Sequence, residues 1–278
     1  MRSFVGMVLA LLAGLGVAQK PLEYPVNAPF KTTLPLRAGS KEQVQISLAK
    51  GSSELSVHLR SRTQSLTVGT VSDGFEPQGA VLAVDFNFDG WLDLAVPMAV
   101  GYGGVNYFYE IYFFDRRSRS FELLNVPGPY DGQFCNPQVS KPEKALLTDC
   151  KSGPAYDYAD YRFIGGKPYL YRTSQMLPLP GFKKDDLVFA TKLYNSRGEV
   201  IRTLWNDDPR DRRGASRTVA QKRLYLYPQP SLRAKPNGYL VRGDKVEILE
   251  VNRSDYSWVK VAYQSRAKGR IVRWVHLP

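Results

Sequence analysis

Histidine is nearly absent from this chain, which has only His58 and His276 among its 278 residues. Histidine is the side chain used most often for general acid–base catalysis, and it is the commonest metal ligand. No H-E-x-x-H, G-x-S-x-G or Cys–His pattern accompanies either residue. His58 alternates with the apolar Val57 and Leu59, so we expect it on the surface of a strand, and His276 lies where chain ends fray. The sequence therefore predicts a protein without enzymatic activity.

The chain also lacks an apolar run long enough to span a membrane comfortably. The apolar stretch 4–15 is too short for a span, but it follows Arg2 and precedes the small-x-small site Gly16-Val17-Ala18. This pattern predicts a signal peptide over residues 1–18, with cleavage near Ala18-Gln19. The mature chain is then periplasmic or secreted and has no membrane span. The alternative is a retained N-terminal anchor.

Cysteine is scarce too, with Cys135 and Cys150 the only two in the chain. Both lie in the exported part, where an oxidising compartment favours a disulfide between them. Fourteen residues separate them, and on the chain-entropy model a loop of that size contributes on the order of 3 kcal/mol. The alternative is two free buried thiols. A zinc site is disfavoured because the two cysteines are better used as a disulfide.

The sequence Asp-Phe-Asn-Phe-Asp-Gly-Trp-Leu-Asp-Leu at residues 85–94 is the most informative segment. Its oxygen-bearing groups match positions 1, 3, 5, 7 (a carbonyl) and 9 of a calcium loop: Asp85, Asn87, Asp89, Trp91 and Asp93. Calcium takes six to eight oxygen ligands at roughly 2.3–2.6 Å, and Gly90 at position 6 permits the sharp turn. The segment predicts a bound Ca²⁺ ion. The alternative is an acidic turn between two strands.

This loop differs from an EF-hand in two respects. Position 12 is Val96, so the usual bidentate glutamate is missing. The flanking segments 81–84 and 92–96 are aliphatic runs of strand length, not amphipathic helices. We expect a further ligand from elsewhere in the fold or from water, and a structural role for the ion. A β-propeller would need several such repeats, and the chain has one.

Apolar residues alternate with other residues from position 44 onward, and no long helical pattern is present. We therefore predict a mainly β protein, with a single-calcium-loop β domain followed by a small SH3-like β-barrel. The predicted segments are a signal peptide (1–18), an extended lead-in (19–40), the calcium-loop β domain (41–205), a charged linker (206–222) and the barrel (223–278).

Acidic residues are outnumbered, with 26 Asp and Glu against 38 Lys and Arg, which gives a net charge of +12. An exported basic protein meets anionic envelope polymers before it meets nucleic acid. The charge therefore favours the cell wall or phospholipid headgroups as partners and disfavours nucleic acid. The alternative is that the charge serves only solubility.

Four tyrosines are candidate partner-binding residues: Tyr102, Tyr107, Tyr156 and Tyr158. Tyr102 and Tyr107 flank glycines beside the calcium segment, and exposed tyrosine suits protein interfaces. The alternative for this pair is a core strand after a glycine turn. The acidic, aromatic stretch 156–161 is complementary to a basic hydrolase, or else it is a loop with its tyrosines packed inward. Asp157, Asp160 and Asp185-Asp186 are expected to be solvated surface charges.

The C-terminal segment resembles a bacterial SH3-like domain. The residues that carry the resemblance are Leu224-Tyr225, Pro228, Pro230-Ser231, 238–249, 258–261, and Gly269 with Trp274-Val275. Such domains are often attached to cell-wall enzymes, and some bind peptidoglycan while others bind protein. The chain has Arg273 where the family has a small residue.

The larger segment resembles periplasmic proteins with one FG-GAP-like calcium loop. The residues that carry this resemblance are 84–94, Gly103-Gly104 with Asn106-Tyr107, and 112–115 leading to Phe121. Some members of that family are immunity proteins against secreted peptidoglycan hydrolases, with a fold like that of periplasmic lysozyme inhibitors. The resemblance implies a protein that restrains a cell-wall hydrolase. The alternatives are a wall-binding module without inhibitory action and a peptidoglycan-processing enzyme.

Overall fold

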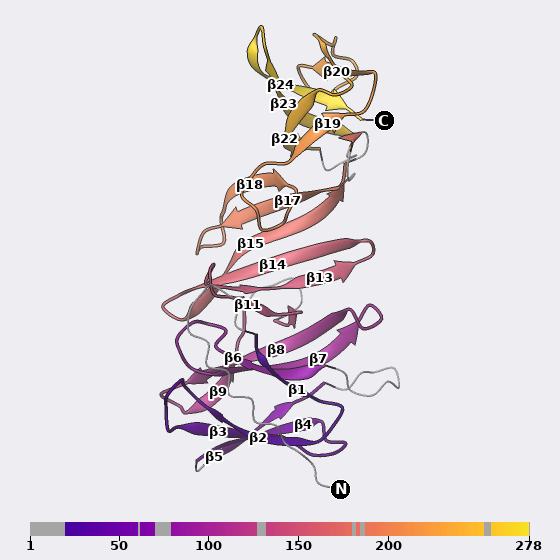
Figure 1. Ribbon diagram of the computed structural model, residues 1–278. Coiled ribbons are helices and arrows are strands. Elements are labelled where there is room, and N and C mark those ends of the chain that lie inside the picture. The colour runs from indigo at the N-terminus through magenta and orange to yellow at the C-terminus, as the bar shows by residue number, and fades with distance from the viewer. Residues whose placement is uncertain are drawn as a thin grey trace.

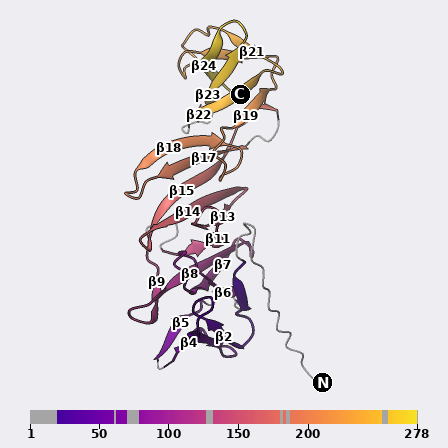
Figure 2. The ribbon, with the colours of Figure 1, turned by 60° about the vertical axis from the view of Figure 1, so that its left-hand side comes forward.

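The computed structural model describes residues 20–60, 62–69, 79–126, 132–179, 182–183, 187–252 and 257–277. Within these residues the regular elements are all β-strands, arranged in four antiparallel sheets. The sheets lie one above another along the long direction of the molecule, as two views show (Figure 1, Figure 2). The prediction of a mainly β fold is confirmed. The predicted signal peptide lies outside the described residues.

The first two sheets of the stack come from the N-terminal half of the chain. Sheet I contains β2 (Phe30–Pro35), β3 (Gln43–Leu48), β4 (Glu54–Leu59) and β5 (Arg62–Thr67). Sheet II contains β1 (Leu22–Pro25), β6 (Ala80–Val84), β7 (Asp93–Gly101), β8 (Asn106–Asp115) and β10 (Phe134–Cys135), with β9 (Ser120–Leu123) paired to β8. The chain therefore contributes β1 to sheet II, then forms sheet I with β2 to β5, and returns to sheet II with β6.

The other two sheets follow in chain order, with one exchange. Sheet III contains β11 (Gln138–Ser140), β12 (Ala145–Leu147), β14 (Ala155–Ile164), β15 (Lys167–Pro178), β17 (Leu187–Tyr194) and β18 (Val200–Asn206), with β13 (Asp149–Ser152) paired to β14. Sheet IV contains β16 (Phe182–Lys183), β19 (Ser216–Val219), β20 (Arg223–Tyr227), β21 (Tyr239–Val241), β22 (Lys245–Val251), β23 (Trp258–Ser265) and β24 (Gly269–His276). The short β16 joins sheet IV although it precedes β17 of sheet III.

Sheet II is buried on both faces, which explains its continuous aliphatic runs. Along β6 and β7, Val81 and Leu94 pack towards sheet I, while Leu82 and Ala95 pack towards sheet III. Because neighbouring residues of a strand point to opposite faces, a strand covered on both sides needs apolar residues at every position. The strands of sheet I have one buried face, so β3 and β4 show the alternation expected from the sequence.

A third apolar cluster joins sheets III and IV. Leu177, Val188 and Trp205 of sheet III pack with Leu224 and Val246 of sheet IV in one buried set. The two ends of the predicted linker are therefore held by a shared core. Burial of each such side chain contributes about 1.5–3 kcal/mol relative to its exposed state.

Two segments outside the predicted domains contain paired strands. Within 19–40, β1 pairs with β6 and β2 pairs with β3. Within 206–222, β19 pairs with β22, and the preceding residues follow the surface of sheet III. The segment 223–278, predicted as a small barrel, contains the strands β20 to β24. No helix in the described parts of the chain is long and apolar enough to cross a membrane.

Candidate partner-binding surface and calcium loop

The predicted calcium loop connects β6 to β7 and is closed by its own side chains. The Asp85 carboxylate accepts the N–H groups of Asp89 (3.2 Å) and Gly90 (2.8 Å). Asn87 Oδ1 accepts the same Asp89 N–H at 3.0 Å, and Asp89 Oδ1 accepts the Trp91 N–H at 2.8 Å. Phe88 and Gly90 adopt positive φ of 64° and 86°. The side chains at positions 1, 3 and 5 thus converge on the loop interior.

Asp93, at position 9, is fully buried at the start of β7. Its two carboxylate oxygens accept the N–H groups of Phe86 (2.9 Å) and Phe114 (3.1 Å), so it ties the loop to β8. Burial raises its pKa well above the ordinary value, and the charges of Asp89 and Asp85 raise the pKa further. Position 12, Val96, is fully buried in the apolar core and offers no oxygen.

The residues of the loop fit Ca²⁺ in type and charge. Burial and the nearby charge of Asp89 raise the pKa of both Asp85 and Asp93, which is the electrostatic situation that a divalent cation relieves. Among the described residues, no three His, Cys, Asp or Glu side chains are already arranged to hold an ion. Asp85 and Asp89 would have to exchange loop N–H partners for the ion, with Asn87 and the Trp91 carbonyl completing the set.

Tyr102 lies at the tip of the hairpin between β7 and β8. Tyr102 is 49% exposed, and Val105 on the same turn is 40% exposed. The backbone of Tyr102 has φ of 53°, a left-handed conformation that is uncommon for a non-glycine residue, and Gly103 and Gly104 continue it at 64° and 89°. The glycines allow the turn that holds the aromatic ring outward.

The base of this hairpin is fixed to neighbouring segments. Asn106 exchanges two hydrogen bonds with the backbone of Lys151 on β13, at 2.9 and 2.8 Å. Asn136 accepts from the Tyr107 N–H at 2.9 Å and donates to the carbonyls of Val105 (3.1 Å) and Asp149 (3.0 Å). The hairpin is therefore a preorganised support for Tyr102.

A disulfide joins the same two segments. Cys135 on β10 and Cys150 on β13 are bonded, with a Cα–Cα distance of 5.6 Å. Each cysteine is adjacent to one of the residues that hold the hairpin, Asn136 and Lys151. The predicted pairing is confirmed, and its position shows that it braces the hairpin support.

Two of the other candidate tyrosines lie beside this hairpin. The Lys151 ammonium is 5.4 Å from the centre of the Tyr102 ring, and Lys151 is paired across strands with Tyr156. Residues directly opposite each other in an antiparallel pair share a face, and Tyr158 follows Tyr156 on that face. The rings of Tyr156 and Tyr158 are 6.4 Å apart. Tyr102, Lys151, Tyr156 and Tyr158 form one row, which we call the tyrosine row.

Tyr107 does not belong to the tyrosine row. It is half-buried in β8 and lines a separate groove of about 750 Å³ between sheets II and III, together with Tyr109. An added Cβ on Gly79 would lie 3.2 Å from the Tyr107 ring, so the strand packs closely there. The structure thus brings together three of the four tyrosines predicted from the sequence.

The stretch 156–161 is part of strand β14, not a loop as one reading of the sequence expected. Asp160 is fully buried and ion-paired with Arg172 (2.6 Å) and Arg210 (3.3 Å), so it cannot face a basic partner. Asp157 is half-buried, and its pKa is raised by burial. Strand alternation places Asp157 and Asp160 on opposite faces, which excludes a catalytic carboxylate pair of these two residues.

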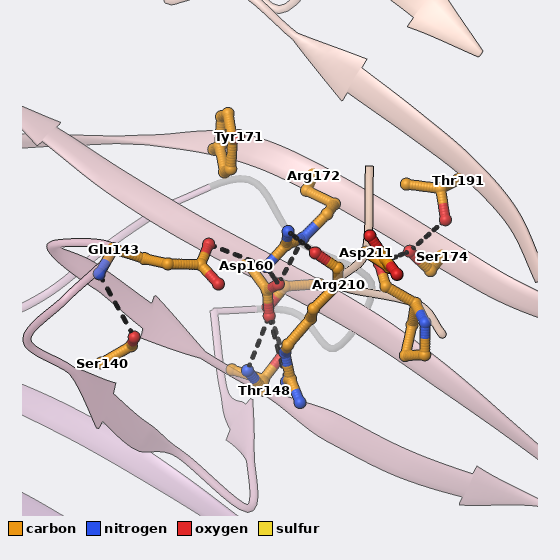
Figure 3. Close-up of polar contacts among 12 residues, drawn as sticks. Ser140, Glu143, Thr148, Asp160, Tyr171, Arg172, Ser174, Thr191, Arg210 and Asp211 are labelled. Atoms are coloured by element: carbon orange, nitrogen blue, oxygen red, sulfur yellow. Dashed lines mark hydrogen bonds and ion pairs between the residues drawn. The ribbon is translucent and has the colours of Figure 1, made fainter. Parts of the chain in front are cut away.

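Asp160 belongs to a buried polar cluster that the sequence analysis missed (Figure 3). Arg172, only 4% exposed in its side chain, also pairs with Glu143 at 3.1 Å and donates to the Arg210 carbonyl at 3.3 Å. Thr148 N–H donates to Asp160 at 3.3 Å. The available signal was weak: β14 and β15 carry several charged residues, among them Asp160 and Arg172, and a charge that becomes buried is nearly always paired.

This cluster holds the segment 207–213 against sheet III. Ser174 Oγ donates to the Pro209 carbonyl at 2.9 Å, and Asn206 Nδ2 donates to the Asp211 carbonyl at 2.6 Å. The Arg210 guanidinium, besides contacting Asp160, lies 5.1 Å from the centre of the Tyr158 ring. The buried cluster therefore also supports one end of the tyrosine row.

The two histidines lie far apart in the sheets and serve local contacts. His58 is exposed on β4, as expected, with Nδ1 at 2.9 Å from the Thr63 hydroxyl. His276 is paired in β24, and its ring is 4.9 Å from the Trp258 ring in an edge contact. The expectation of a frayed end at His276 is wrong, because cross-strand pairing and Trp258 hold it.

The fold and these contacts define an all-β protein of four stacked sheets with a braced aromatic row at its side. No protein family model matches the chain. No curated protein is detectably similar to it in sequence. A solved structure described as that of a Xanthomonas type IV secretion system related protein is similar to this one with a TM-score of 0.42 and 14% sequence identity, covering 67% of this chain and 99% of that chain. A likeness this weak carries no conclusion about function.

Proposed function

We propose that this protein is exported and binds a protein partner through the tyrosine row, restraining a peptidoglycan hydrolase without catalysing a reaction itself. The observation that carries the proposal is the exposed Tyr102, held at 49% exposure on a hairpin that two asparagines and a disulfide brace. The FG-GAP-like resemblance of residues 84–94 supplies the hydrolase as the class of partner.

Rigid support matters because binding must overcome the loss of side-chain and loop freedom. Ordering a side chain at an interface costs about 0.5–1.5 kcal/mol, and a preorganised loop avoids much of that cost. Tyrosine anchors in fixed positions are typical of the few residues that dominate interface energies. Tyr102 combines exposure with a fixed backbone, so it is the best candidate anchor in the row.

Calcium has a structural role in this proposal. The loop that would hold it lies between β6 and β7, and Leu92 N–H donates at 2.8 Å to the carbonyl of Leu36, the residue that follows β2 of sheet I. An ion at 100 times its Kd would stabilise the folded state by about 2.7 kcal/mol. Chelation should lower the Tm, and Asp89→Ala should abolish that response. A Tm that chelation leaves unchanged would contradict the calcium assignment.

The experiment for the main proposal is a wall-lysis assay in calcium with purified peptidoglycan, a lysozyme-type hydrolase and the mature protein. The wild-type protein should suppress lysis. Tyr102→Ala should weaken suppression at least tenfold, since a central anchor contributes about 2 kcal/mol or more. Leu123→Ala is the matched control, because Leu123 is 50% exposed on β9, which pairs with the end of β8 away from the Tyr102 hairpin.

Each result of this assay has a distinct meaning. Equal loss in the Tyr102 and Leu123 variants would contradict the assignment of the tyrosine row. Undiminished lysis would require a pull-down against the hydrolases of the same cell, and failure to capture one would contradict the inhibitor function. Release of wall fragments by the protein alone would favour the alternative of a peptidoglycan-processing enzyme.

A second candidate function, wall binding by the C-terminal sheet, has its own supporting observation. Tyr225 and Tyr239, both about half exposed, lie with ring centres 6.4 Å apart, and the Arg223 guanidinium is 4.9 Å from the Tyr239 ring. This exposed pair sits on the segment that resembles bacterial SH3-like domains. Co-sedimentation with peptidoglycan, lost in a Tyr225→Ala/Tyr239→Ala variant, would support it.

A further inference from the structure

A positively charged cleft lies beside the calcium loop, apart from the tyrosine row. It has a volume of about 570 Å³ and is lined by Trp91, Phe114, Glu42 and three arginines: Arg116, Arg117 and Arg119. The three arginines come from the tight turn between β8 and β9. Asp115 fixes this turn, because its Oδ1 accepts the N–H groups of Arg117 (2.5 Å) and Ser118 (3.0 Å).

Trp91 forms an aromatic wall of this cleft. Its ring stacks on Phe114 at 5.4 Å between centres, and Phe114 belongs to the buried core. The guanidinium carbons of Arg116 and Arg37 lie 5.4 Å and 5.9 Å from the centre of the Trp91 ring. Arginine planes stack on aromatic rings and keep their N–H donors free at the edges. Trp91 thus positions two cations that come from different turns.

Among the described residues, two of the three arginines that line this cleft, Arg116 and Arg117, have no ion-pair partner. Glu42 is its one lining carboxylate, and it pairs with Arg119 at 3.1 Å. In the described part of the chain, no carboxylate lies within ion-pair distance of Arg37, Arg116 or Arg117. Some exposed arginines on other turns have such partners, as in the pairs Arg197–Glu199 and Arg213–Asp211, whereas Arg233 and Arg242 have none among the described residues. What distinguishes this cleft is the set of three arginines on one turn beside the Trp91 ring.

We propose that this cleft is a binding site for a phosphate group. Guanidinium donors match phosphate and carboxylate oxygens in bidentate geometry. A carboxylate has only two acceptor oxygens, and the carboxylate that lines the cleft, Glu42, already engages Arg119. Two further guanidinium groups, Arg116 and Arg117, line the cleft, and Arg37 lies at the same Trp91 ring. These cations suit a group with three acceptor oxygens and up to two negative charges, which is a phosphate. The proposal is independent of hydrolase inhibition, because it uses none of the tyrosine row.

The test is calorimetric titration of the mature protein with inorganic pyrophosphate at low ionic strength, without added divalent cations. The test variant is Arg116→Ala/Arg117→Ala, whose two side chains are exposed on a turn. The matched control is Arg197→Ala/Arg202→Ala, which removes the same charge from exposed positions at the β17–β18 hairpin. Arg116→Lys/Arg117→Lys keeps the charge but removes the planar guanidinium.

We expect saturable binding that weakens at least tenfold in Arg116→Ala/Arg117→Ala and less than twofold in the control variant. The lysine variant should fall between them. Equal weakening in the two alanine variants would overturn the site, because it would reflect net charge alone, and so would a lack of saturable binding to the wild type. Tighter binding of polyglutamate at the same arginines would overturn the choice of phosphate. Competition by a glycerol phosphate oligomer would identify a phosphodiester polymer, as opposed to a free phosphate, as the source.

Discussion

Replacement of Asp160 by alanine is the most informative perturbation of this fold. Asp160 is fully buried and accepts two contacts from Arg172, at 2.6 and 2.8 Å, and one from Arg210 at 3.3 Å. Its removal leaves Arg172 buried with only Glu143 as an ionic partner. Breaking a buried ion pair from one side costs about 3–5 kcal/mol. That is a large share of the roughly 5–15 kcal/mol that stabilises a typical domain.

The physical reason for this cost is the charge left behind, and a double variant tests that reason. In Asp160→Ala/Arg172→Met the uncompensated guanidinium is also removed and an apolar side chain takes its place. If the stranded charge causes the loss, the double variant should be more stable than Asp160→Ala alone. Asp211→Ala, which removes a partly exposed carboxylate paired with the exposed Arg213 from the segment that the cluster holds, should leave stability close to that of the wild type.

The assay is urea unfolding followed by far-ultraviolet circular dichroism, with hydrogen exchange of the β14 and β15 amides as a local measure. Exchange should increase first in these two strands, since Asp160 and Arg172 are paired across them. The reasoning is refuted if Asp160→Ala lowers the unfolding free energy no more than Asp211→Ala does. It is also refuted if the loss in the double variant equals the sum of the losses in Asp160→Ala and Arg172→Met measured separately.

Three further predictions concern other parts of the structure. Cys135→Ser/Cys150→Ser should lower the unfolding free energy by about 2–4 kcal/mol, measured by urea unfolding, and should speed amide exchange in the Tyr102 hairpin. Burial raises the pKa of Tyr109 to about 12, so stability present below pH 10 should fall by about 3 kcal/mol between pH 10 and 12, as the unfolded chain ionises first. In Tyr109→Phe, alkaline unfolding curves should lose that part of the pH dependence. Leu94→Ala, at a fully buried position between sheets I and II, should cost about 2–5 kcal/mol in the same assay, and a cost below 1 kcal/mol would contradict the packing.

The strands were predictable where one face is solvated. Alternation at Val44, Ile46 and Leu48 identified β3, and Leu55, Val57 and Leu59 identified β4. The turn at 115–118 was also predictable, because its residues are typical of a tight hairpin. In β14, by contrast, the polar and aromatic residues made a strand resemble a loop. The strand forms because Asp160 is ion-paired with Arg172 of β15 and with Arg210 of the 207–213 segment.

The sequence pointed to three tyrosines of the candidate site, but it gave neither their arrangement nor the parts of Lys151 and Arg210. Tyr102 and Tyr156 are separated by more than 50 positions in the sequence, and local patterns carry no information about contacts between segments so far apart. What joins them is Lys151, which pairs with Tyr156 across strands and lies under the Tyr102 ring. Lys151 is held there by Asn106 and by the neighbouring disulfide. The charged residues of 206–222 made this segment resemble a linker. One of them, Arg210, contacts the Tyr158 ring at the end of the tyrosine row. The residues that build the surface are thus the ones whose partners are distant in sequence, so the surface follows only once the sheets are stacked.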